Sequence, residues 1–334
     1  MNRYEELHDL LKRGALFKLV CGAGNEDIKE VRRLATIYTL AGAAMHDLSA
    51  NTDVVVAANE GIDIAYRIAP SLNKNIPIRP YLNVSIGLKG DPHVRKAKID
   101  KAMCTGCGEC IVACRQGAIN KDFIIQEYKC IGCGDCGNAC VFSAIEFIHR
   151  KPDFEKILPR CVQLGVETME LHAVTEDDEG AIHDWRLLNS VIGDNFLSVC
   201  LDRSVLSNKR LIERVRSMYE ITGKRMIVQA DGVPMSGEGD DYNTTLQAVA
   251  CADIVKKSGI PVMILLSGGT NSKTGILARQ CGVKANGVSI GSFARKIVKK
   301  YTTQDQFDTD LDLVKEAVSV AESLVIANME AISG

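Results

Sequence analysis

Two runs of cysteine constrain this chain more than any other feature of its sequence. The first run recurs at an offset of 26 residues, together with the glycines between its cysteines. The repeated positions are Cys104, Cys107, Cys110 and Cys114, and then Cys130, Cys133, Cys136 and Cys140. Self-similarity at a fixed offset indicates two copies of one structural unit.

The spacing C-x2-C-x2-C-x3-C is typical of proteins that hold two [4Fe–4S] clusters, in which the fourth cysteine of each run ligates the other cluster. Short gaps that contain glycine let three thiolates converge on one cluster. We therefore predict one cluster on Cys104, Cys107, Cys110 and Cys140, and a second on Cys130, Cys133, Cys136 and Cys114. Zinc is the alternative, but a zinc site takes four ligands in two pairs, which this interlocked spacing does not provide.

From about residue 97 to residue 148 the block resembles the bacterial two-cluster ferredoxins. It departs from them after each fourth cysteine, where Arg115 and Val141 replace the usual proline. That proline shapes the turn and is no ligand, so the departure concerns the local backbone and leaves the cluster prediction intact.

The other five cysteines, Cys21, Cys161, Cys200, Cys251 and Cys281, are scattered singly. This distribution fits metal ligands plus buried thiols in a reducing compartment better than it fits a disulfide framework. Residues 1–13 lack the apolar stretch of a signal peptide, and no later segment resembles a membrane span. We therefore expect a cytoplasmic protein without a membrane partner.

The charge balance of the chain bears on whether the protein binds nucleic acid. The formal net charge is −2 in 334 residues, and both signs are spread along the chain. A nucleic-acid-binding protein would be expected to carry a basic patch, so we expect no nucleic-acid partner. The apolar content of 46% is enough to bury a normal core.

Outside the cysteine block, short apolar runs alternate with amphipathic segments, which indicates repeated βα units. Strands are expected at residues 17–21, 45–49, 78–86, 168–174, 196–201, 225–230, 261–266 and 287–290. Helices are expected at residues 27–44, 53–69, 154–164, 182–191, 208–222, 244–258, 272–281 and 310–329.

Eight such units predict a (β/α)8 barrel, a fold of about 250 residues. The alternative is a flavodoxin-like sheet, but that fold has fewer strands, and no G-x-G-x-x-G follows the first strand. The domains would be residues 1–91, the first three βα units; residues 92–150, an inserted two-[4Fe–4S] ferredoxin domain; and residues 151–334, the rest of the barrel.

Two loops after the last strands predict a ligand site on the barrel. Ser267, Gly268, Gly269 and Thr270 follow the seventh strand, and Gly291 and Ser292 follow the eighth. Barrels commonly bind phosphate between these two loops. The pair resembles the loops of FMN-binding barrels, including the dihydroorotate and dihydropyrimidine dehydrogenase family, which implies FMN or another phosphate-bearing small molecule. The alternative is that the glycines only turn the chain.

Polar residues also gather at the expected strand ends, where barrels keep their active sites. They are Lys18, Cys21, Asp47, Ser49, Asn83, Ser85, Glu170, His172, Asp202, Arg203, Gln229 and Asp231. Each could line a pocket, but each could equally be a solvated loop residue or a structural partner. A buried ion pair is the simplest role for Lys18 or Glu170, and inert packing the simplest for Cys21. No residue is assigned as catalytic.

Several stretches together resemble one known family, the light-dependent period (LdpA) proteins of cyanobacteria. They are residues 17–23, 38–43 and 288–296 and the cysteine block. The resemblance implies an iron–sulfur protein that conveys cellular redox state to the circadian clock.

Two functions therefore remain open. The first is electron transfer or redox sensing with two [4Fe–4S] clusters and a redox partner protein. The second is an FMN-dependent oxidoreductase whose clusters feed the barrel's carboxyl face. We favour the first, because the sequence offers cluster ligands but no convincing acid, base or hydride partner. The strand at 225–230 also lacks the lysine that flavin dehydrogenases place near the flavin ring, which leaves enzymatic activity undecided.

Overall fold

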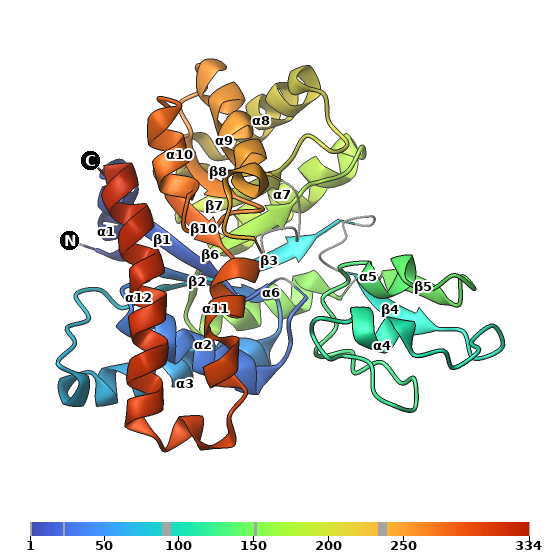
Figure 1. The fold of residues 1–334 in the computed structure, drawn as a ribbon. Coiled ribbons are helices and arrows are strands. Elements are labelled where there is room, and N and C mark those ends of the chain that lie inside the picture. The colour runs from blue at the N-terminus through green and yellow to red at the C-terminus, as the bar shows by residue number, and fades with distance from the viewer. Residues whose placement is uncertain (1, 23, 89–94, 150–151, 233–238, 334) are drawn as a thin grey trace.

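The computed structural model describes residues 2–22, 24–88, 95–149, 152–232 and 239–333. Eight parallel strands close into a barrel, in the order β1-β10-β9-β8-β7-β6-β3-β2. The strands are β1 (Leu16–Val20), β2 (Met45–Ser49), β3 (Tyr81–Gly87), β6 (Val166–His172), β7 (Leu197–Leu201), β8 (Met226–Asp231), β9 (Met263–Ser267) and β10 (Gly287–Ile290). The predicted (β/α)8 fold is confirmed (Figure 1).

Helices cover the outside of the barrel. They are α2 (Ile28–Leu40), α3 (Thr52–Ile68), α6 (Phe154–Gln163), α7 (Asp178–Ile192), α8 (Asn208–Thr222), α9 (Tyr242–Lys257), α10 (Thr274–Gln280), α11 (Ser292–Thr302) and α12 (Leu311–Ser333). Short 3₁₀ turns lie at Pro70–Leu72, Gly223–Arg225 and Asp305–Asp308. Polar side chains cap many helix starts; those of Asp27, Asn51, Asp177 and Ser207 accept hydrogen bonds from first-turn N–H groups.

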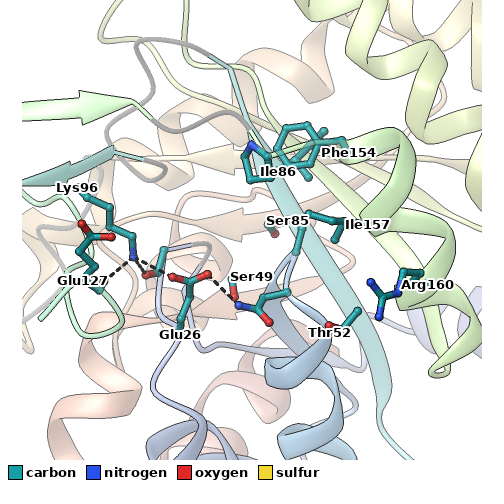
Figure 2. Close-up of a pocket in the computed structure, with 14 residues that line it drawn as sticks. Glu26, Ser49, Thr52, Ser85, Ile86, Lys96, Glu127, Phe154, Ile157 and Arg160 are labelled. Atoms are coloured by element: carbon teal, nitrogen blue, oxygen red, sulfur yellow. Dashed lines mark hydrogen bonds and ion pairs between the residues drawn. The ribbon is translucent and has the colours of Figure 1, made fainter.

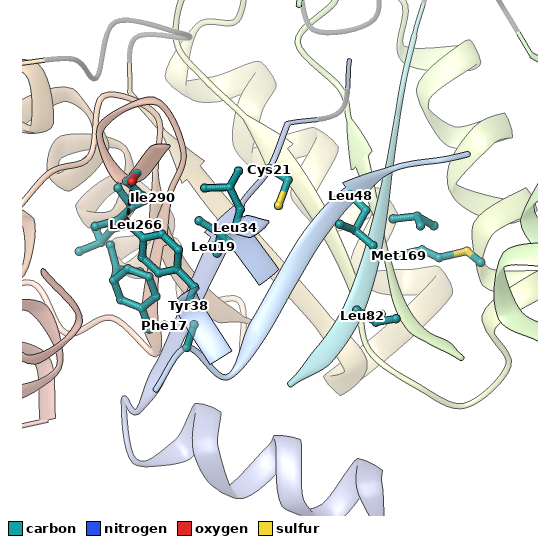
Figure 3. Close-up of a cluster of buried hydrophobic side chains, with 14 of the residues drawn as sticks. Phe17, Leu19, Cys21, Leu34, Tyr38, Leu48, Leu82, Met169, Leu266 and Ile290 are labelled. Carbon is teal, nitrogen blue, oxygen red and sulfur yellow. Dashed lines mark hydrogen bonds between the residues drawn. The ribbon is translucent and has the colours of Figure 1, made fainter. Parts of the chain in front are cut away.

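The main core lies between the strands and the outer helices. Outward-facing Phe17 and Leu19 of β1 pack with Leu34 and Tyr38 of α2, as Figure 3 shows. The rings of Phe17 and Tyr38 stack with centroids 6.2 Å apart. This layer is apolar because side chains alternate along a strand, and alternate positions of β1 face the helices.

A helix that the sequence interpretation missed closes the amino end of the barrel. Helix α1 (Arg3–Lys12) places Leu7, Leu10 and Leu11 against inward-facing apolar side chains at the strand starts. Those strand residues are Leu16, Met45, Tyr81, Ile227 and Leu265. The segment is mostly polar, and its short apolar stripe is too weak a pattern to predict a helix. The stripe becomes buried only when the folded barrel provides an apolar end for it to pack against.

Helix α11 was also absent from the sequence-based expectation. It carries several lysines, and only a narrow apolar stripe that includes Phe293, Ala294 and Val298 is buried. No helix in the described part of the chain is both long and apolar enough to cross a membrane.

The cysteine block forms a separate module between β3 and α6. Its antiparallel strands β4 (Arg95–Ile99) and β5 (Ile145–His149) flank helices α4 (Glu109–Ala113) and α5 (Asp135–Asn138). Figure 1 shows the module beside the barrel, on the side away from both chain termini. The expected domain limits at 91/92 and 150/151 fall outside the described residues.

The packing of α1 against the amino end of the barrel gives the first prediction. Leu11 is fully buried, so replacing it with alanine should lower the free energy of unfolding by about 2–5 kcal/mol. Leu246→Ala is the matched control, because Leu246 is 47% exposed. Urea denaturation measures both variants. Equal, small effects would show that α1 is not part of the folded core.

Candidate metal centre and barrel interior

The eight cysteines of the module surround two separate cavities. One is lined by Cys104, Cys107, Cys110 and Cys140, and the other by Cys114, Cys130, Cys133 and Cys136. The fourth cysteine of each run thus faces the cavity of the other run. The lining sets have the same members as the two ligand sets predicted from the spacing.

The pKa values of the thiols reflect this grouping. Burial, followed by the neighbouring thiols Cys133, Cys114 and Cys130, raises the pKa of Cys136 to about 12. Burial also raises the pKa of Cys110, with contributions from three thiols of its own cavity. Four thiols in one cavity can ionise together only if a cation compensates their charge. Iron bound to thiolate supplies such a charge, so the donor set fits an iron–sulfur cluster.

The backbone adds hydrogen bonds to these sulfurs. The N–H groups of Ala118 and Ala144 each donate to the cysteine four residues earlier, Cys114 and Cys140, at 3.3 Å. Gly108 and Gly134, at the starts of α4 and α5, have φ of 85° and 99°. Glycine adopts this left-handed conformation without the strain of a Cβ. The two copies therefore fold alike, and in each the last cysteine accepts the same backbone hydrogen bond.

The two positions that usually hold proline have different surroundings. Arg115 forms an ion pair with Asp135 at 2.5 Å, and its carbonyl accepts a hydrogen bond from Lys299 of α11 at 2.6 Å. Val141 is 84% exposed. The Arg115 side chain therefore adds a contact within the module, whereas the link to the barrel uses the backbone carbonyl, which a proline would also provide.

Lys96 makes a second and more extensive link. Its Nζ donates to the carbonyls of Gly24, Glu127 and Cys130 at 2.6, 2.9 and 2.8 Å, and the Glu26 carboxylate lies 3.6 Å away. Gly24 and Glu26 belong to the loop after β1, whereas Cys130 lines a cysteine cavity. One ammonium, on a side chain that is 11% exposed, thus connects the barrel mouth to the second cysteine set.

A cavity of about 440 Å³ lies beside this link (Figure 2). The module contributes Lys96 and Glu127 to its wall. The barrel contributes residues at the ends of β2 and β3, at the start of α3 and from α6, among them Ser49, Thr52, Ser85, Phe154 and Arg160. The cavity therefore separates the module from the carboxyl end of the barrel.

The interior of the barrel is polar above the apolar seal. Buried inward-facing residues include Lys18, Asp47, Asn83, Ser85, Thr168, Glu170, His172, Ser198, Cys200, Gln229, Asp231 and Ser289. Lys18 donates a hydrogen bond to Glu170, and its Nζ lies 3.7 Å from Asp47. The ion pair suggested for Lys18 or Glu170 is confirmed, with each the partner of the other.

The hydrogen bonds of this network connect five neighbouring strands. Asp47 accepts from Asn83 and Ser85, both at 2.5 Å, and Glu170 accepts from Ser198 at 3.1 Å. Burial raises the pKa of Asp47, and Lys18 opposes that rise. Burial lowers the pKa of the Lys18 ammonium, but Asp47 and Glu170 outweigh it and hold that pKa above its ordinary value. Lys18 is therefore a charged structural cation and not a neutral amine nucleophile.

Comparison with known proteins identifies the family to which this chain belongs. The family described as "Light dependent period A C-terminal domain" matches residues 161–327, half of the chain. This chain belongs to the light-dependent period A family. The family described as "4Fe-4S binding domain" matches residues 97–120, which contain the first cysteine run. The chain is thus an iron–sulfur protein of the light-dependent period A family.

One relative is similar over nearly its whole length. Light dependent period A of Synechococcus elongatus is 29% identical, and the match covers 98% of this chain and 94% of the relative. Among solved structures, the YdjI aldolase of Escherichia coli K12 superposes with a TM-score of 0.51 at 8% identity, covering 99% of this chain and 96% of the other. A fructose-1,6-bisphosphate aldolase described as putative, from Coccidioides immitis, has a TM-score of 0.49 at 11% identity, covering 99% and 94%. The likeness to YdjI shows the barrel fold.

The two loops predicted to bind phosphate meet at the carboxyl end of this family member. Thr270 Oγ1 donates to the Ser289 carbonyl at 2.5 Å, and Gly291 immediately precedes α11, which begins at Ser292. Gly268 and Gly269, after Ser267, have φ of 62° and 71°. A Cβ on Gly268 would lie 1.3 Å from an oxygen of Asp231, so close packing already requires glycine there. Phosphate or FMN binding at these loops stays a prediction.

The remaining strand-end candidates divide between the interior and the surface. Arg203 is exposed and donates to Asn208 at 2.9 Å, outside the network. Burial raises the pKa of the Cys21 thiol far above its ordinary value, as expected for an inert thiol. Sequence reasoning missed Lys96, Ser198 and Cys200 as site residues. The last two alternate along β7 and could have been found from the two-residue period of an inward face.

The buried ion pair makes the second prediction. Lys18→Met leaves Asp47 and Glu170 buried without their cation, so the free energy of unfolding should fall by about 3–5 kcal/mol. Lys209→Met, at an 85% exposed side chain, is the control and should be nearly neutral.

The pH dependence of this effect follows from the carboxylates. Burial already raises the pKa of Asp47 and Lys18 opposes that rise, so without Lys18 the folded-state pKa of Asp47 should lie further above the unfolded value of roughly 4. The protonated folded form is then favoured, so the deficit is full at neutral pH and shrinks as the pH falls toward 4. Denaturation at several pH values measures it, and a deficit that grows on acidification would contradict the ion pair.

Proposed function

We propose that this protein binds two [4Fe–4S] clusters and acts in electron transfer or redox sensing. The observation that carries the proposal is the division of eight cysteines into two cavities, with one cysteine of each run exchanged. Two cubane clusters need this crosswise arrangement, whereas zinc does not.

Each module helix carries a thiol for one cluster and is followed by a thiol for the other. On α4, Cys110 faces one cavity, and Cys114, at the end of the same helix, faces the other. Four helical residues rise about 6 Å, so the two clusters would be close neighbours. Cys136 and Cys140 repeat the relation at α5. An electron on one cluster could therefore pass readily to the other.

A partner surface fits the cluster on Cys104, Cys107, Cys110 and Cys140. Cys107 is exposed, and Phe142, which also lines this cavity, is 46% exposed. Val112 and Val141, on α4 and just after Cys140, are each 84% exposed. Exposed apolar residues beside a cluster suit docking of a redox partner protein. The other cluster faces Lys96 and the barrel.

Lys96 provides a route by which the barrel could sense the cluster. Adding an electron to the cluster on Cys130 makes its surroundings more negative and strengthens the attraction for the Lys96 ammonium. Because the same ammonium holds Gly24 and Glu26, a redox change would act on the loop after β1. This link would convert a change in cluster charge into a change in the loop after β1, at the mouth of the barrel.

The second candidate is an FMN-dependent oxidoreductase. It is favoured by the polar barrel interior and by the hydrogen bond between the loops at Thr270 and Ser289. Anaerobic purification followed by assay of released flavin separates the candidates. Stoichiometric flavin would support the oxidoreductase, and flavin-free protein with intact clusters would support the carrier or sensor.

Cluster assembly makes the third prediction. Anaerobically prepared protein should contain roughly eight irons and eight sulfides per chain. Cys114→Ser should disturb the cluster on Cys130, Cys133 and Cys136, although Cys114 belongs to the first run. Cys161→Ser, at a lone buried cysteine of α6, is the matched control and should keep full iron.

Iron and sulfide analysis and the paramagnetic signals of the reduced protein provide the measurement. Four irons or fewer in the unaltered protein, or a colourless zinc protein, would contradict two clusters. Loss of the signal from the other cluster in Cys114→Ser would contradict the exchanged ligands.

The Lys96 link makes the fourth prediction. Removing a positive charge near a cluster disfavours its reduced state, so Lys96→Met should lower the reduction potential of the cluster on Cys130. Lys98→Met is the control on the same strand, because Lys98 is 60% exposed and paired with Glu146. Spectroscopic redox titration measures both variants. Equal potentials in Lys96→Met and in Lys98→Met would exclude the link.

A further inference from the structure

Three potential metal ligands meet inside the barrel, away from the cysteine module. Glu170 and His172 lie two residues apart on β6 and face inward, because side chains alternate along a strand. His172 is paired in register with Cys200 of β7. One ligand atom from each of the three lies within 4.8 Å of the others, and all three residues are buried.

The spacing of these atoms suits one metal ion. His172 Nε2 and Glu170 Oε1 are 3.2 Å apart. Two ligands of a tetrahedral zinc, at bond lengths of about 2.0–2.2 Å, are separated by about 3.4 Å. The other Glu170 oxygen accepts hydrogen bonds from Lys18 and Ser198, which fixes the carboxylate and leaves Oε1 directed toward His172. Supporting contacts of this kind orient metal ligands.

The cysteine of this group has a proton acceptor beside it. Asp231 Oδ2 accepts the Cys200 thiol hydrogen at 2.9 Å. A metal-bound cysteine must lose that proton, and its acceptor is already in place.

We propose that Glu170, His172 and Cys200 form a binding site for one divalent transition metal ion of the zinc class. A donor set of one nitrogen, one sulfur and one carboxylate oxygen suits such an ion better than Mg²⁺ or Ca²⁺, which prefer oxygen ligands alone. On binding, the Cys200 thiol loses its proton and the sulfur bonds to the metal. Three protein ligands leave a fourth position for water or another ligand, at the carboxyl end where barrels keep their active sites.

The test uses the full chain with its clusters loaded, stripped of loose metal and dialysed against Zn²⁺. One zinc per chain should remain. X-ray absorption at the zinc edge should show one sulfur at about 2.3 Å and nitrogen or oxygen ligands at about 2.0–2.2 Å. This signature separates the barrel site from zinc in a cysteine cavity, which would show four sulfurs.

Variants check the assignment independently. Cys200→Ser should remove the sulfur and weaken zinc binding by more than the roughly 10–100-fold loss that follows changes around a metal site. Cys161→Ser, at a buried cysteine outside the barrel interior, should bind zinc like the unaltered protein. The X-ray absorption spectrum of the unaltered protein tests the site even if Cys200→Ser does not fold.

Three results would overturn the site: no zinc retained, four sulfurs at the zinc, or a single sulfur that persists in Cys200→Ser. Iron and sulfide content are measured on the same samples. A protein that lacks the zinc site can therefore be told apart from one that lacks the two clusters.

Discussion

The antiparallel pairing of β4 with β5 is the constraint on which the rest of the molecule depends. A parallel barrel closes only if β3 pairs with β6, and this pairing runs from Leu82 to Gly87 on β3 although the whole module lies between the two strands. Register between Arg95 and His149 places the entry and the exit of the module side by side. The inserted chain can therefore fold around its own cavities without opening the barrel.

The barrel that is preserved in this way has two chemically different ends. Apolar side chains and α1 seal the amino end, where Leu11 is fully buried. The carboxyl half holds a polar network centred on Lys18, Asp47 and Glu170. Buried charge of this kind is weak evidence for stability alone, because apolar residues would pack as well. Its position at the functional end of the fold, next to the module, argues for a role in binding.

Local patterns and tertiary contacts differ in how far the sequence reveals them. Cysteine spacing is local, so the two ligand sets could be predicted before their cavities were seen. The alternation of short apolar runs with amphipathic segments likewise predicted eight strands, and Lys18 and Glu170 were among the polar residues expected at strand ends. The role of Lys96 could not be predicted, because its partners Gly24 and Cys130 are distant in sequence and meet only in the folded chain. Helices α1 and α11 were missed because their short apolar stripes depend on the barrel they cover.

These features describe an iron–sulfur protein of the light-dependent period A family in which the cysteine module and the polar barrel both contact the ammonium of Lys96. The central claim is that the module holds two clusters in exchanged ligand sets. Anomalous diffraction at the iron edge, from crystals grown without oxygen, tests it most directly. We predict two separate iron sites, one enclosed by Cys104, Cys107, Cys110 and Cys140 and one by Cys114, Cys130, Cys133 and Cys136. A single iron site, or a cluster held by four consecutive cysteines of one run, would contradict the account.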